Sequence, residues 1–342
     1  MTRYLRLLAV FGLLQLCILG LLLALDSPRT YMASAADKGR LLATAPGPRI
    51  IMLGGSSAAF GVNSPLLERE LGDRYQPINL GLNAGIGLDF MLNWVAASVR
   101  KGDVVVLSPE YEIVWSNEPT WYTLNEMLRF LPHAWDYMPE DERIWYAYRL
   151  LDWPVEIAHD VSVSTTNRLM PQPLNQQERT YSRDSLNRFG DNTSGWTLRP
   201  TYAGDSSPFA APFSPDETEL QIARLRGFAQ WCSRKGATVA YAYPPLARDK
   251  YLANRADIER LAVILESELN VPFLDSPGDE VFDPTDFYDS FYHLRGSAAA
   301  RRTTDLVRHL RDAHVVAMAS AVVQPSEANQ KLGLPVSSSG SK

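Results

Sequence analysis

Short apolar runs alternate with amphipathic stretches along most of this chain. The apolar runs predict strands over residues 50–53, 76–80, 103–107, 238–243 and 271–275. The stretches between them predict helices over residues 65–71, 90–99, 215–235, 256–269 and 296–309. Because residues 103–107 are apolar on both sides, their strand should be central. The alternation predicts a three-layer α/β/α fold around a doubly wound, mainly parallel sheet.

Residues 112–213 interrupt this alternation with a segment rich in tryptophan, tyrosine and proline. We expect a lid insertion that covers the top of the sheet, inside one domain that spans residues 49–315. Residues 28–48 are mostly small and polar and should form a linker. Residues 316–342 show little periodicity and should form a disordered tail.

An uncharged apolar stretch over residues 7–25 lies near the N-terminus and is long enough to cross a bilayer as a helix. Arg3 and Arg6 precede it, so the positive side should stay in the cytoplasm and the rest of the chain should be exported. Residues 1–27 are therefore expected to be a cytoplasmic stub and a transmembrane anchor. The alternative is a secreted protein, released by cleavage of a signal peptide at Ala33-Ser-Ala35. The stretch exceeds the usual signal core, which favours the anchor.

Composition excludes some classes of protein. The 342 residues are 46% hydrophobic, which is enough for a sizeable core. The net charge is −6 and no basic patch is visible, so nucleic acid is not expected as a partner. Cys17 and Cys232 fit neither a metal-binding spacing nor a disulfide framework.

The turn Gly54-Gly-Ser-Ser57 follows the first predicted strand and carries the main candidate chemistry. Ser64 is expected to cap the next helix, so the strand, turn and helix would lift a serine hydroxyl to the carboxyl edge of the sheet. A serine nucleophile needs a base and donors for the oxyanion. His293 follows the last predicted strand and should lie above the same edge, and Asp289 could orient its ring. The Ser57 N–H would be one oxyanion donor.

On these residues the chain resembles the SGNH/GDSL hydrolase superfamily, over about residues 49–111 and 236–312. It is most similar to exported, membrane-anchored members that handle cell-envelope polysaccharides and acyl groups. The resemblance implies an SGNH-like, flavodoxin-like sheet and makes Ser57 the nucleophile. The same resemblance assigns the second oxyanion donor to the Gly85 N–H, with Gly81 as the alternative. The Asp289 to His293 spacing is one residue longer than is usual in the family.

The third block of the family is the point of departure. Ser108-Pro-Glu-Tyr111 puts Glu110 where the family has the asparagine that completes the oxyanion hole. An ionised carboxylate there would repel an oxyanion. Unless Glu110 is protonated or points away, the hole must be built differently, with Asn83 as a candidate.

The resemblance implies a serine-dependent O-acyl esterase or acyltransferase, with acetyl the favoured group, acting on a cell-envelope carbohydrate. The protein would sit in the bacterial inner membrane with its domain in the periplasm, beside envelope polysaccharide machinery. No metal or organic cofactor is implied. The alternative, which Glu110 favours, is a non-catalytic, membrane-tethered glycan-binding or scaffold protein. A phosphate-ester enzyme would need metal ligands that the sequence does not display.

Overall fold

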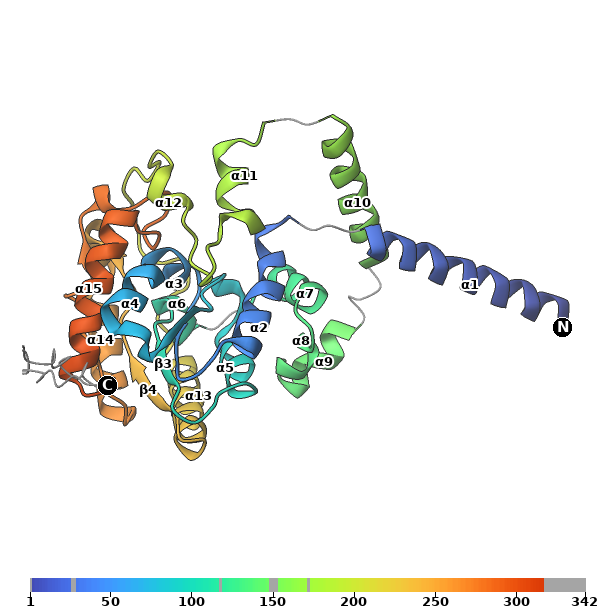
Figure 1. The fold of residues 1–342 in the computed structure, drawn as a ribbon. Helices are drawn as coiled ribbons and strands as arrows, with labels where there is room; N and C mark the ends of the chain where they lie inside the picture. The colour runs from blue at the N-terminus through green and yellow to red at the C-terminus, as the bar shows by residue number, and fades with distance from the viewer. Residues whose placement is uncertain (1, 26–28, 117–118, 148–152, 171–172, 317–342) are drawn as a thin grey trace, which may run out of the picture.

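The computed structural model describes residues 2–25, 29–116, 119–147, 153–170 and 173–316 (Figure 1). Its centre is a parallel sheet in the order β2-β1-β3-β4. The strands are β1 (Arg49–Leu53), β2 (Gln76–Asn79), β3 (Val104–Leu107) and β4 (Thr238–Tyr241). This confirms the mixed α/β class and the parallel sheet, with β3 between two neighbours as expected.

Helices cover both faces of the sheet because the strand side chains alternate between two buried cores. Ile50, Met52 and Val106 pack with α4 (Ser64–Leu71) and α15 (Gly296–Asp312). The opposite face, with Ile51, Leu53 and Val105, packs in the larger core. That core also receives apolar side chains from α5 (Leu88–Ala96), α13 (Pro215–Arg234) and α14 (Arg248–Glu268).

The fifth predicted strand is reduced to a single parallel bridge between Tyr241 and Phe273. Pro272 accepts a hydrogen bond from the Tyr241 N–H at 2.9 Å but has no N–H of its own to extend a ladder. A separate parallel pair joins β5 (Leu246–Ala247) to β6 (Val281–Phe282), which the sequence pattern did not predict.

The segment after β1 is more helical than expected. Helix α3 (Ser56–Gly61) begins within the Gly-Gly-Ser-Ser turn, so Ser57 lies in its first turn and not in a loop. The expected cap of α4 was wrong by one residue: the Asn63 side chain accepts from the Leu66 N–H at 3.1 Å. The Ser64 hydroxyl instead donates to Asp191 at 2.6 Å.

Residues 29–48, the described part of the expected linker over residues 28–48, belong to the fold. They contain η1 (Tyr31–Ser34) and α2 (Ala35–Thr44), and Tyr31, Met32 and Leu42 are buried in the larger core. The small residues that resemble a linker allow close packing here, since Ala33 and Ser34 are also buried.

The insertion is mostly helical in its described parts. Its elements are α6 (Tyr111–Trp115), α7 (Trp121–Phe130), α8 (Ala134–Tyr137), α9 (Glu140–Ala147), α10 (Trp153–Leu169), α11 (Gln176–Thr180), η5 (Arg183–Ser185) and α12 (Ser194–Thr197). The last part packs against the loop that carries the candidate histidine, because the N–H groups of Thr201 and Tyr202 both donate to the Tyr288 carbonyl. Among the described residues, three short 3-10 helices lie outside the insertion and after β1: η2 (Gly72–Arg74), η3 (Ala84–Ile86) and η6 (Pro284–Asp286).

At the N-terminus, α1 (Thr2–Leu25) extends away from the domain (Figure 1). Within the described ranges, no helix combines the length and the hydropathy that a membrane span requires. The anchor over residues 1–27 therefore stays a prediction. The predicted disordered tail lies, from residue 317 onward, outside the described residues.

Candidate active site

Ser57 lies at the carboxyl edge of the sheet, where β1 passes into α3. A Cβ on Gly54 would lie 2.3 Å from the Ser108 carbonyl oxygen, so only glycine lets this turn pass so close to the end of β3. The Ser57 side chain is fully buried. Among the described residues its Oγ has no hydrogen-bond partner. A buried hydroxyl without a partner is costly, which makes this atom a candidate for function.

Glu110 points toward Ser57, not away from it. Its Oε1 accepts from the Ser57 N–H at 2.8 Å, and its Oε2 accepts from the Gly55 N–H at 2.9 Å. A Cβ on Gly55 would lie 2.5 Å from the Glu110 carboxylate, so glycine is needed here as well. Burial raises the pKa of Glu110 above its ordinary value, and the neighbouring N–H groups and the Ser57 hydroxyl act in the opposite direction. The expected oxyanion donor, the Ser57 N–H, is therefore already engaged.

A second glycine-rich turn, over residues 79–87, follows β2 and lies against the Gly54-Gly-Ser-Ser57 turn. A Cβ on Gly55 would lie 2.8 Å from the Ala84 nitrogen. The Gly85 N–H, expected to stabilise an oxyanion, donates to the Asn83 side chain at 2.8 Å. The Gly81 N–H likewise donates to Asn79 Oδ1 at 2.9 Å. Both turn donors, and the Asn83 side-chain oxygen, are thus used within the turn itself.

His293 and Asp289 form the expected pair. His293 Nδ1 lies 2.7 Å from Asp289 Oδ1, which leaves Nε2 for another partner. The longer spacing is accommodated by a turn in which the His293 N–H donates to the Ser290 carbonyl at 3.2 Å. The imidazole stacks on the Phe60 ring, with centroids 4.0 Å apart and planes 9° apart. Phe60 is on α3, three residues after Ser57, so the histidine lies beside the serine helix without a hydrogen bond to the serine hydroxyl.

Tyr181 belongs to this site, although the sequence did not single it out. Its hydroxyl donates to Asp289 Oδ2 at 2.9 Å and lies 3.5 Å from His293 Nδ1. Its ring packs edge-on against Tyr31 at 5.8 Å. Burial and the neighbouring Asp289 both raise the pKa of Tyr181, so the phenol stays a donor. It lies just after α11, where no local spacing marks it as a site residue.

A buried arginine joins the loops around the site. Arg302 on α15 donates to Glu280 at 2.6 Å, to Ser108 Oγ at 3.1 Å and to the Tyr243 carbonyl at 3.0 Å. It also reaches the Gly61 carbonyl at 3.3 Å. These contacts connect the last residue of α3 with the residue that follows β3, two positions before Glu110. The sequence shows only an arginine on an amphipathic helix, so this role was missed.

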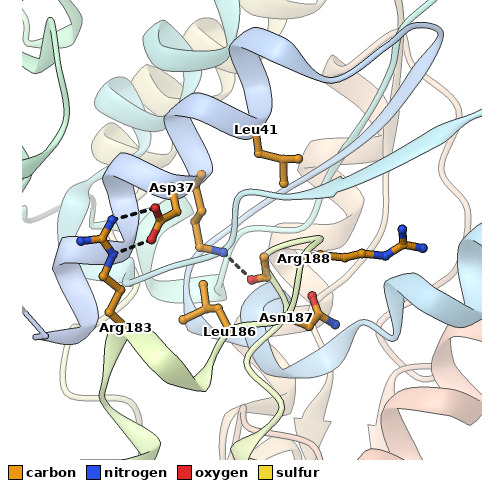
Figure 2. Close-up of a pocket in the computed structure, with 8 residues that line it drawn as sticks. Asp37, Leu41, Arg183, Leu186, Asn187 and Arg188 are labelled. Carbon is orange, nitrogen blue, oxygen red and sulfur yellow. Dashed lines mark hydrogen bonds and ion pairs between the residues drawn. The ribbon is translucent and has the colours of Figure 1, made fainter.

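A pocket of about 260 Å³ lies apart from these residues (Figure 2). At one side of it Arg183 and Asp37 form a two-bond ion pair, at 2.6 and 2.7 Å. The buried Lys38 ammonium donates to the carbonyls of Asn79 and Gly190, and burial lowers its pKa to about 7. The pocket is lined by Asp37, Lys38, Leu41, Arg183, Leu186, Asn187, Arg188 and Gly190. Because its charged groups already have partners, the pocket is a weaker candidate than the serine site.

No protein-family model and no curated protein matches the chain. In the part of the chain that the structure describes, no three or more His, Cys, Asp or Glu side chains are grouped to hold a metal ion. The candidate site comprises Ser57, Glu110, Asp289, His293 and Tyr181.

Proposed function

We propose that this protein is a serine-dependent O-acyl ester enzyme, an esterase or an acyltransferase, with an SGNH-like site. The observation that carries the proposal is the Asp289–His293 pair, stacked on the helix that begins beside Ser57. A histidine held through Nδ1 by a carboxylate has the tautomer that a general base requires. The buried Ser57 hydroxyl without a partner supplies the nucleophile.

In this mechanism Ser57 Oγ attacks the acyl carbonyl carbon while His293 Nε2 takes the serine proton. The tetrahedral intermediate expels the alcohol, which receives that proton from His293, and leaves an acyl-serine. Water or an acceptor hydroxyl then attacks, with His293 again as the base, and restores Ser57. Asp289 stabilises the imidazolium and Tyr181 positions Asp289. Because no hydrogen bond joins His293 to Ser57 in this structure, substrate binding must bring them together.

The proposed substrate is an O-acylated carbohydrate of the cell envelope, with acetyl the favoured group. This part of the proposal rests on the resemblance to exported SGNH members and includes an inner-membrane anchor with the domain in the periplasm. The N-terminal packing supports an uncleaved chain: Tyr31 and Met32 are buried in the core, and cleavage at Ala33-Ser-Ala35 would remove them. The Tyr31 hydroxyl also donates to the Leu82 carbonyl at 3.0 Å.

The test is covalent labelling of the full-length protein with a fluorophosphonate probe, together with turnover of a chromogenic acetyl ester. We expect labelling and turnover in the wild type and in Ser56→Ala, and loss of both in Ser57→Ala. Ser56→Ala is the matched control because it removes a hydroxyl from the same turn. Labelling that survives in Ser57→Ala would rule out Ser57 as the nucleophile.

The second candidate function is a non-catalytic glycan-binding or scaffold protein of the envelope. The position of Glu110 favours it, because the carboxylate engages N–H groups that catalysis needs. This alternative predicts that the wild type binds an envelope polysaccharide without turnover or labelling. It also predicts that Ser57→Ala and His293→Asn bind that polysaccharide as tightly as the wild type.

A further inference from the structure

The Glu110 side chain occupies backbone N–H donors beside Ser57 at the distances found in oxyanion holes. Donors in an oxyanion hole lie about 2.7–3.1 Å from the charged oxygen. The Ser57 and Gly55 N–H groups lie 2.8 and 2.9 Å from the two Glu110 oxygens. Both oxygens of the Glu110 side chain therefore accept from a backbone N–H. An acyl oxyanion at Ser57 would need the same Ser57 N–H.

A second feature marks the same place as a binding site. The Ser57 hydroxyl is fully buried beside these donors and has no partner among the described residues. Gly55 has no Cβ, and a Cβ there would fill the space that the carboxylate occupies. The site is therefore shaped around an oxygen-rich group next to the serine.

We propose that Glu110 is a built-in occupant of the oxyanion site, and that an acyl ester substrate must displace it before Ser57 can react. This inference rests on the proposed function and adds its regulation. The resting protein is closed by its own carboxylate, and occupancy by substrate and by Glu110 is mutually exclusive.

The backbone on both sides of Glu110 is held in place. On one side Ser108 continues the β3 ladder, donating its N–H to the Leu53 carbonyl at 2.7 Å, and is held by Arg302. On the other side Tyr111 is buried, and its ring stacks near those of Trp115 and Tyr243. Displacement therefore requires rotation of the Glu110 side chain between two fixed anchors.

The experiment compares fluorophosphonate labelling rates of full-length variants. Glu110→Gln keeps the size of the side chain but sets an NH₂ group against one of the backbone N–H donors, which weakens its hold. Glu110→Ala removes the carboxylate from the Ser57 and Gly55 N–H groups altogether. We expect both to label Ser57 about tenfold faster than the wild type or more, since loss of one charge-assisted hydrogen bond corresponds to at least that factor. The matched control is Glu112→Gln, a neighbouring carboxylate that does not contact Gly55 or Ser57; its rate should equal that of the wild type.

A readout independent of catalysis completes the test. Amide hydrogen exchange of residues 54–58 should be slow in the wild type, faster in Glu110→Ala, and slow again when acetate is added to Glu110→Ala. Circular dichroism and thermal unfolding verify that each variant folds. If Glu110→Ala does not fold, the comparison is made with Glu110→Gln.

The outcomes separate the two proposals. If the wild type labels at Ser57, labelling that is equal or slower in both Glu110 variants would overturn the built-in occupant. Exchange in Glu110→Ala that acetate leaves unchanged would overturn it too. If no variant labels and acetate still restores protection, the occupant stands and the proposed esterase or transferase function fails.

Discussion

Tyr181 shows how a single hydroxyl from the insertion completes the candidate pair. It donates to the Asp289 oxygen that does not contact His293, so it holds the carboxylate in the plane that the imidazole needs. Its ring also rests against Phe60, the residue on which His293 stacks. Tyr181 is therefore a positioning residue that acts through Asp289.

Tyr181→Phe is expected to lower kcat about threefold to tenfold with little change in KM, because it loosens the orientation of the base without removing a substrate contact. Steady-state kinetics on a chromogenic acetyl ester measures both constants. Tyr202→Phe is the control, since the Tyr202 hydroxyl contacts Asp249 instead. A rise in KM at constant kcat would assign Tyr181 to substrate binding.

Glu112 gives a stability prediction that depends on pH. Burial raises its pKa from 4.5 to about 7, although the Tyr292 hydroxyl donates to it at 2.6 Å. Between pH 4.5 and 7 the folded protein holds a proton that the unfolded chain has released, so this group's contribution to stability falls as pH rises. The full shift corresponds to roughly 3 kcal/mol.

Glu112→Gln cannot titrate, so the stability difference between this variant and the wild type should grow in favour of the variant from pH 5 to pH 7. Urea unfolding at several pH values measures it. A difference that stays constant over this range would show that Glu112 does not titrate there in the folded protein.

A buried ion pair and its hydrogen bonds join helix α15 to the loops at the sheet edge, in addition to the apolar packing of the helix. Arg302 and Glu280 are both buried, and the guanidinium also joins Ser108 to Gly61. The next residue toward the N-terminus, Arg301, pairs with Asp286 at 2.7 Å on the surface. Adjacent residues on one helix thus offer a buried and an exposed pair for comparison.

Arg302→Met is expected to destabilise the fold by about 3–5 kcal/mol, because it leaves the buried Glu280 carboxylate without its partner. Arg301→Met should cost about 1 kcal/mol or less. Urea unfolding of the two variants gives both values. Equal losses would mean that the buried network does not hold α15.

Helix α3 packs so closely on the second glycine-rich turn that a methyl group cannot fit between them. A Cβ on Gly81 would lie 2.4 Å from the Ala59 nitrogen. Gly227, in the exposed interior of α13, has no atom within 4 Å of its Cβ position. Adding a methyl group should therefore have opposite effects on stability at the two glycines.

Gly81→Ala should destabilise the fold by about 2 kcal/mol or more, because backbone atoms must shift. Gly227→Ala should stabilise it by roughly 0.5–1 kcal/mol through helix propensity. Thermal unfolding gives the sign of each change. A stabilised Gly81→Ala protein would contradict the close contact between α3 and the turn.

The domain as a whole begins before the first strand. Tyr31 and Met32 lie in the same core as strand residues, and α2 places the buried Lys38 against carbonyls at the end of β2 and in the insertion. The N-terminal segment, the sheet and the insertion are therefore packed together, which a linker would not require.

A chain that begins at residue 36 should consequently be less stable than one that begins at residue 29, by about 3 kcal/mol or more, because it lacks the buried Tyr31 and Met32. Urea unfolding of the two truncated proteins provides the comparison. Equal stability of the two proteins would show that residues 29–35 do not stabilise the domain and act as a linker.

Much of the architecture could be predicted from the sequence, because strands and helices depend on residues that are close together in the chain. The runs at β1, β2, β3 and β4 are short and apolar, and Ser214 caps α13 through a local hydrogen bond from the Glu217 N–H. The same local reasoning failed where packing overrides composition. Residues 29–48 resemble a linker in composition but are folded, and Pro272 shortens the last predicted strand to a bridge.

The candidate site divides in the same way. Ser57, Asp289 and His293 follow from a turn, a loop and the rule that parallel strands end at one edge, all of which are properties of short segments. The contact of Glu110 with Ser57 spans 53 positions of the sequence, and the contact of Tyr181 with Asp289 spans 108. Such contacts depend on which loops meet after folding, and a buried carboxylate turns toward whichever donors lie within reach. The sequence alone determined the candidate serine, aspartate and histidine, and the packed fold brought a carboxylate to the N–H donors beside the serine.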